Sequence, residues 1–197
     1  METPTQKVEG INLEANDTSG NAFALGVTVI YGVHGKCSIT AIENRVISGE
    51  AMSFYKLEVQ KPPLSRSTRN EPAIWVPVAS ANAQGLRVPV TAVEVDDILT
   101  MLASREYFFP ITDNWSVVQP KLETTIRLEG CKGLAKVLSY LFVLKRKQIV
   151  PTHEVSRMDE LVTKLLLREL SDALGESIRS LEERLNKLLR QKLTPSS

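Results

Sequence analysis

The residues that could perform chemistry are few and widely separated in this sequence. The two cysteines, Cys37 and Cys131, and the two histidines, His34 and His153, match no spacing of a metal site or a redox pair. The chain also has no nucleophile-base pair and no glycine-rich loop of the kind that holds phosphate. We therefore expect no enzymatic activity, no metal and no cofactor, and we interpret both cysteines as small buried residues.

The distribution of charge points to one end of the chain. The 197 residues hold 24 Lys and Arg against 23 Asp and Glu, for a formal net charge of +1. Residues 132–197 hold thirteen basic and eight acidic side chains, a net charge of +5, whereas residues 1–60 have a net charge of −3. Any polyanion is therefore expected to bind the C-terminal part. The near-neutral total disfavours tight, independent binding to DNA.

Composition places the chain among ordinary globular proteins. It is 43% hydrophobic and 24% charged, which allows a core without strong self-repulsion. No apolar run approaches the ~18 residues of a membrane-spanning helix, and the N-terminus lacks the features of a signal peptide. We expect a cytoplasmic protein with no membrane partner.

The first half of the chain has the pattern of short strands. Residues 1–22 are polar and predict a disordered tail. Runs rich in β-branched and aromatic residues follow, with turn signals between them, at residues 27–31, 38–42, 46–47, 53–60 and 74–78. They predict a small antiparallel barrel or curled sheet. The polar stretch 61–73, which contains Arg66 and Arg69, is interpreted as a solvated loop, with phosphate contact as the alternative.

The second half has helical periodicity. Thr91 and Glu94 have the spacing of a capping box, which predicts a helix over 92–104. Further helices are predicted over 120–128, 133–147, 154–174 and 176–193, and Gly175 is a suitable C-cap. The fold class is therefore α+β, with a β domain at 23–90, an all-helical domain at 91–193 and a tail at 194–197.

Several motifs in this order resemble one family. They are LGVTVIYGVHG at 25–35, AIENRVISGE at 41–50, WVPV at 75–78, GLR at 85–87 and Asn114-Trp115. Together they resemble the CarD/CdnL family of bacterial RNA-polymerase-binding transcription regulators. The resemblance covers about residues 23–118, and the ordered set is more specific than any single short motif.

The resemblance implies a function and a set of site residues. Members have a Tudor-like β domain that binds the RNA polymerase β subunit, and a compact helical domain that contacts promoter DNA near the upstream edge of the −10 element. The protein would thus stabilise the promoter open complex without catalysis. By position, Arg45 and the strand Trp75-Val76-Pro77 match the polymerase-binding surface. Trp115 matches the tryptophan that wedges into the minor groove at the edge of the bubble.

The residues give these assignments a physical basis. A proline in a strand is confined to an edge or a strand end, and an exposed edge is a place where another protein can add a strand. Trp75 beside Pro77 would supply an aromatic anchor, although it could instead belong to the barrel core. Trp115 lies in a polar segment, which favours an exposed wedge at an unstacked base step. The alternative is that it caps the helical bundle.

One departure from the family pattern limits the expected DNA contact. The family usually follows the tryptophan with an arginine pair, whereas this chain continues with Ser116-Val117-Val118. DNA binding should therefore be weak or use other basic residues. The candidates are Lys121, Lys132, Lys136, Lys145, Arg146 and Lys147. The alternative function is an adaptor of RNA polymerase or another protein that has lost direct DNA contact. We expect a monomer, although the amphipathic last helix could recruit a helical partner or a second copy.

Overall fold

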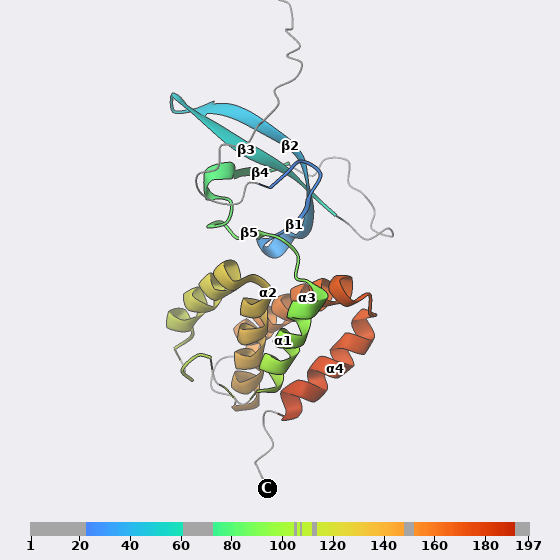
Figure 1. Ribbon diagram of the computed structural model, residues 1–197. Coiled ribbons are helices and arrows are strands. Elements are labelled where there is room, and N and C mark those ends of the chain that lie inside the picture. The colour runs from blue at the N-terminus through green and yellow to red at the C-terminus, as the bar shows by residue number, and fades with distance from the viewer. Residues whose placement is uncertain are drawn as a thin grey trace, which may run out of the picture.

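The computed structural model describes residues 23–60, 73–104, 106, 108–111, 114–147 and 152–191. These residues form an antiparallel sheet followed by helices, so the predicted α+β class is confirmed (Figure 1). The tails predicted at 1–22 and 194–197, and nearly all of the polar stretch 61–73 with Arg66 and Arg69, lie outside the described residues.

The sheet has five strands in the order β4-β3-β2-β1-β5, and each neighbouring pair is antiparallel. The strands are β1 (Thr28–Tyr31), β2 (Gly35–Ile47), β3 (Glu50–Val59), β4 (Ile74–Pro77) and β5 (Leu86–Arg87). A short 3-10 helix, η1 (Gly32–His34), joins β1 to β2. The sheet is open, with β4 at one edge and β5 at the other.

The long β2-β3 hairpin extends beyond the core of the sheet. The runs predicted at 38–42 and 46–47 belong to one strand, because the ladder with β3 continues through polar residues to the pair Ile47 and Glu50. The two-residue turn between the strands has Ser48 at φ 54° and Gly49 at φ 87°. Two positive φ values match the natural twist of a hairpin, which is why a glycine is favoured there. The hairpin projects away from the helices (Figure 1).

The helices are α1 (Ala92–Ala103), α2 (Trp115–Lys147), α3 (Thr152–Leu174) and α4 (Ile178–Gln191). The capping box is confirmed: the Thr91 side chain accepts from the backbone N–H of Glu94, and the Glu94 carboxylate accepts from the backbone N–H of Thr91. The element α2 is two helical segments joined at a kink, since Gly130 has φ 59° and ψ −125°. Its first segment begins at Trp115, five residues before the predicted start at Pro120.

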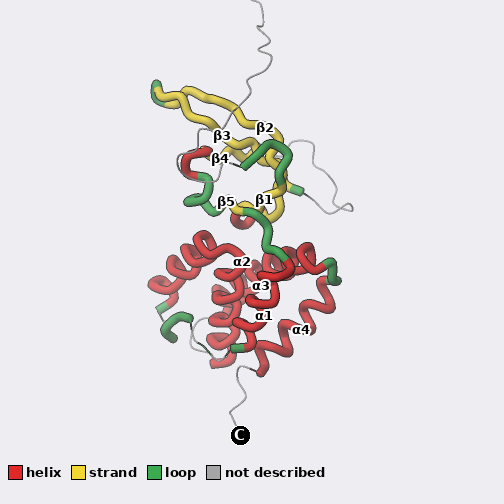
Figure 2. The backbone as a smooth tube through the Cα atoms, in the orientation of Figure 1, coloured by secondary structure: helices red, strands yellow, loops and turns green. Residues whose placement is uncertain are grey.

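Buried side chains form two separate clusters. One lies in the sheet and includes Val29, Ile39, Tyr55 and Leu57. The other joins all four helices. Figure 2 shows that the sheet lies over one end of the helices, with β1 and β5 nearest to them. Residues 88–91 link β5 to α1, and ion pairs between the sheet and α3 bring the two halves into contact.

Candidate functional site

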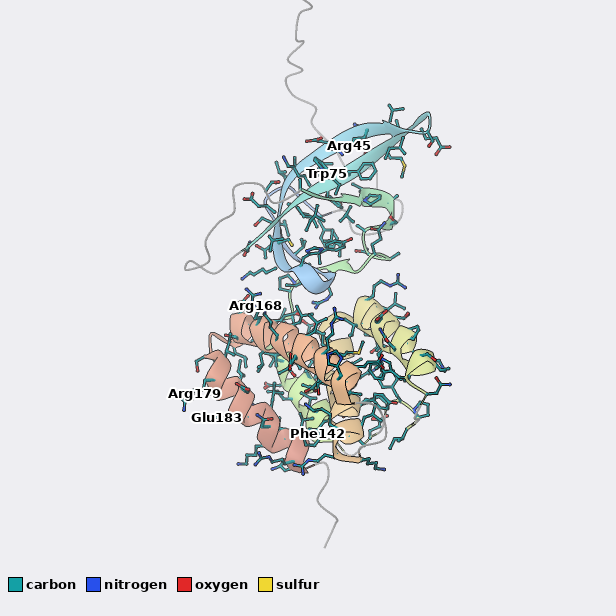
Figure 3. The ribbon with its side chains drawn as sticks, turned by 180° about the vertical axis from the view of Figure 1, so that it is seen from behind. Arg45, Trp75, Phe142, Arg168, Arg179 and Glu183 are labelled. Atoms are coloured by element: carbon teal, nitrogen blue, oxygen red, sulfur yellow. The ribbon has the colours of Figure 1, made fainter. Side chains whose placement is uncertain are left out.

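Two residues predicted to bind the polymerase lie against each other on the sheet. Arg45 is on β2 and Trp75 is on β4, with β3 between them. The guanidinium carbon of Arg45 lies 3.5 Å from the centroid of the Trp75 ring, a close cation–π contact. Lys56, which is paired with Trp75 in the strand register, has its Nζ 5.6 Å from the same ring. Figure 3 shows Arg45 and Trp75 together on the sheet, away from the helices.

This Arg45–Trp75 face is accessible. The Arg45 side chain is 41% exposed and also donates from Nη2 to Glu43 at 3.3 Å, while Trp75 is half-buried. The strand register places Ile47, which is 47% exposed, further along β2 on this face. An aromatic ring held under a guanidinium, with apolar area beside it, is the composition of a protein-binding hot spot.

The other two predicted polymerase-binding residues have different positions. Strand alternation turns Val76 to the opposite face from Trp75, and Val76 is completely buried in the sheet core. The predicted contact of Val76 with a partner would therefore have to use its backbone. Pro77 is half-buried at the end of β4, and β4 is an edge strand, as the proline indicated. Strand alternation puts Pro77 on the same face as Trp75, and the outer backbone edge of β4 pairs with no further strand among the described residues.

Trp115 is not an exposed wedge. It is 9% exposed and belongs to the helical core. Trp115, Val118 and Leu122 have the i, i+3, i+7 spacing of one buried helix face, and all three are in that core. The polar neighbours Asn114 and Ser116 face solvent at the helix start. The helical spacing of Trp115, Val118 and Leu122 could have indicated from the sequence that Trp115 is buried. The polar residues beside Trp115 suggested the opposite.

The predicted DNA-binding cations do not form one surface. Lys136 forms an ion pair with Glu129, and Lys145 forms one with Asp159 at 2.7 Å. Lys145 is nonetheless exposed, as are the four cations that form no ion pair among the described residues: Lys121, Lys132, Arg146 and Lys147. Lys132 and Arg146 lie on the same helical face as Ser139 and Val143, because the steps along this face are seven, four and three residues. Because Ser139 and Val143 are buried, this face is covered between the two cations.

A further pair of charged residues joins the sheet to the helices. Arg87 on β5 donates two hydrogen bonds to Glu169 on α3, at 2.5 and 2.7 Å. Burial by itself lowers the pKa of Arg87, but the hydrogen bonds and the charge of Glu169 outweigh it and raise the pKa. Sequence reasoning missed this pair. The sequence did contain one sign of it: Glu169 lies on the buried face of α3, three residues after Leu166 and seven after Val162.

Gly130 makes room for the same arginine. A Cβ atom at this position would overlap the Nε and Cδ atoms of the Arg87 side chain. The kink of α2 thus lets the guanidinium pass close to the helix backbone on its way to Glu169. Lys36 on β2 forms a second, more exposed ion pair with Asp172 on α3, at 3.1 Å. Both contacts fix how the sheet sits on the helices.

Neither protein-family models nor curated proteins yield a match for this chain. In the part of the chain that the structure describes, no helix combines the length and the apolar character needed to cross a membrane. The described residues also bring no three His, Cys, Asp or Glu side chains together as metal ligands. Cys37 and Cys131 are both buried thiols, as predicted.

Proposed function

We propose that this protein is a bacterial transcription regulator that binds the β subunit of RNA polymerase through the Arg45–Trp75 face. Its sheet would act as the Tudor-like domain of the CarD/CdnL family, in the cytoplasm and without catalytic activity. The contact of Arg45 with Trp75, at 3.5 Å, is the observation that supports this most. Two residues that the resemblance assigns to one function occur together on one accessible face.

The geometry suits a docking function. A tryptophan provides a large contact area at low conformational cost, and the stacked guanidinium holds its ring in place before binding. The edge of β4 lies beside this face and pairs with no further strand among the described residues. A strand of the partner could therefore pair with β4 while its side chains contact Trp75 and Arg45.

Burial of Trp115 favours an adaptor over a promoter wedge. To enter an unstacked base step, the indole would have to leave the helical core and expose the cavity it fills. Direct contact with promoter DNA is the second candidate, favoured by four exposed cations that form no ion pair among the described residues: Lys121, Lys132, Arg146 and Lys147. Scattered over two segments of α2, they would give weak binding with a shallow salt dependence.

Two measurements test the proposal. Gel filtration with purified bacterial core RNA polymerase should show the protein eluting with the polymerase. Fluorescence anisotropy against fork-junction promoter DNA at low salt then separates the two candidates. An adaptor leaves the anisotropy unchanged when the protein is added alone, whereas the DNA-contacting candidate raises it and loses binding as salt increases. Failure to elute with the polymerase would overturn the docking function.

A further inference from the structure

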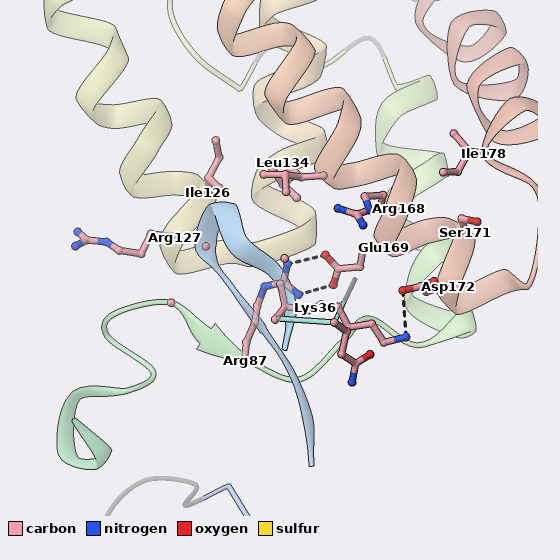
Figure 4. Close-up of a pocket in the computed structure, with 16 residues that line it drawn as sticks. Lys36, Arg87, Ile126, Arg127, Leu134, Arg168, Glu169, Ser171, Asp172 and Ile178 are labelled. Atoms are coloured by element: carbon pink, nitrogen blue, oxygen red, sulfur yellow. Dashed lines mark hydrogen bonds and ion pairs between the residues drawn. The ribbon is translucent and has the colours of Figure 1, made fainter. Parts of the chain in front are cut away.

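A cavity of about 370 Å³ lies where the sheet meets the helices. Its wall is formed by β1, β2 and β5 on one side and by α2, α3 and the start of α4 on the other (Figure 4). This volume is at the lower end of the range of about 300–1,000 Å³ for small-molecule sites, which often lie between domains. None of the residues assigned to docking or DNA contact lines this cavity.

The cavity has an apolar wall beside its charged residues. Leu134 is buried, and Ile126 and Leu165 are partly buried residues packed on the helical core. Ile30 closes the cavity from the sheet side and is also buried. A ligand with an apolar body would remove these side chains from the remaining solvent, which is the main source of affinity in such sites.

Two of the four basic side chains at the cavity are balanced by acids. Arg87 is balanced by Glu169, and Lys36 is balanced by Asp172. Arg168, on the helical side of the cavity, has neither an ion pair nor a hydrogen bond from its side chain among the described residues. Arg127 also lines the cavity, but its side chain projects away from the other labelled residues (Figure 4). Of the two arginines at the cavity that have no ion pair among the described residues, Arg168 is therefore the one placed to contact a ligand inside it.

We propose that this cavity binds a small organic anion with an apolar body. Its carboxylate, sulfonate or phosphate would accept hydrogen bonds from the Arg168 guanidinium, and its body would pack on Ile126, Leu134 and Leu165. Because the cavity wall comes from both halves of the protein, the bound anion stabilises the sheet against the helices. This inference is independent of the proposed docking function, since the Arg45–Trp75 face lies elsewhere on the sheet.

Two fluorescent probes that differ in one charged group test the proposal on the full chain. Anilinonaphthalene sulfonate has an apolar double-ring body and one negative charge, and N-phenylnaphthylamine has the same body without the charge. We expect one molecule of the sulfonate to bind per chain, at least tenfold more tightly than the neutral amine. Arg168→Ala removes the charged hydrogen-bond donor of the site, so it should weaken sulfonate binding by tenfold or more.

Arg179→Ala is the matched control, because Arg179 is a highly exposed arginine on α4 outside the cavity. It should leave both affinities unchanged. Leu165→Trp should fill the cavity and reduce binding of both probes, and a retained thermal unfolding midpoint checks that each variant folds. Equal binding of the sulfonate by the parent chain and Arg168→Ala would overturn the proposal. So would an equal affinity for the neutral amine.

Discussion

Arg87 and Glu169 form a two-bond ion pair between the last strand of the sheet and α3, at 2.5 and 2.7 Å. The Glu169 carboxylate is 5% exposed and also accepts a hydrogen bond from the backbone N–H of Val90, at 3.1 Å. A buried charge is tolerated when it is paired and its other lone pairs are used. The pair therefore holds the two halves of the protein in one relative position.

Arg87→Ala should destabilise the protein strongly, because it leaves the buried Glu169 carboxylate without its cation. Breaking a buried pair by removing one partner costs about 3–5 kcal/mol of unfolding free energy. Arg87→Lys keeps the charge but loses the two-bond geometry, so it should lower the unfolding free energy by less than Arg87→Ala does. Urea denaturation measures both, with Arg179→Ala as the exposed control. A loss below about 1 kcal/mol, the range of a surface ion pair, would contradict this account.

Gly130→Ala should be destabilising for two separable reasons. The positive φ of Gly130 strains any L side chain, and its new Cβ would overlap the Arg87 side chain. In a chain that already has Arg87→Ala, only the backbone strain remains. The penalty of Gly130→Ala should therefore fall in that background, by a coupling of about 0.5–3 kcal/mol in a double-mutant cycle. Strictly additive losses would show that the two residues do not meet.

Trp115→Ala should behave as a core substitution. Removing a buried tryptophan costs about 3–5 kcal/mol of unfolding free energy, since the cavity it leaves is only partly filled. Trp115→Phe keeps an aromatic ring in the core and should cost less. Guanidinium denaturation compares the two variants with the parent chain. An Ala variant as stable as the parent would mean that the ring is outside the core, which would restore the wedge hypothesis.

The capping box makes a small, pH-dependent contribution to stability. The Thr91 backbone N–H, and then its hydroxyl, donate to Glu94 and lower the pKa of that carboxyl from its ordinary value of 4.5. Folding therefore favours the charged form of Glu94. Its contribution to stability is fully present above pH 4.5 and is lost as the pH falls through the folded-state pKa. Glu94→Ala should lower stability by up to about 1 kcal/mol at neutral pH.

The same substitution should change stability little in strong acid, since Glu94 is then protonated in both the folded and unfolded states. Urea midpoints of the parent chain and Glu94→Ala, compared across this pH range, check the trend. Midpoints that stay equally far apart in acid would mean that the carboxylate charge is not what stabilises the helix start.

Local patterns predicted most of the fold, because each depends on residues close in sequence. The capping box of Thr91 and Glu94 occurs where the sequence indicated it, and the turn at Ser48-Gly49 lies between two predicted strand runs. The start of α2 was missed, since Pro120 favoured a later beginning than Trp115. Alternation could not say which of Trp75 and Val76 faced the core, because that depends on which face of the sheet the rest of the chain covers.

The candidate site was predicted only in part for a similar reason. Arg45 and Trp75 were chosen separately, and their stacking depends on β3 lying between their strands. The cations assigned to DNA were chosen from composition, which does not show that Lys136 and Lys145 are paired with acids. The Arg87–Glu169 pair joins residues 82 positions apart, so no local pattern could match them.

Isothermal titration calorimetry with the purified β subunit of a bacterial RNA polymerase tests the central claim most directly. The parent chain and Arg179→Ala should bind alike, whereas Trp75→Ala and Arg45→Glu should each weaken binding by at least tenfold, about 1.4 kcal/mol or more. The exposed cation–π contact is worth only about 0.5–1 kcal/mol, so both variants should stay folded by circular dichroism. Folded variants that bind the β subunit as tightly as the parent chain would contradict docking through the Arg45–Trp75 face.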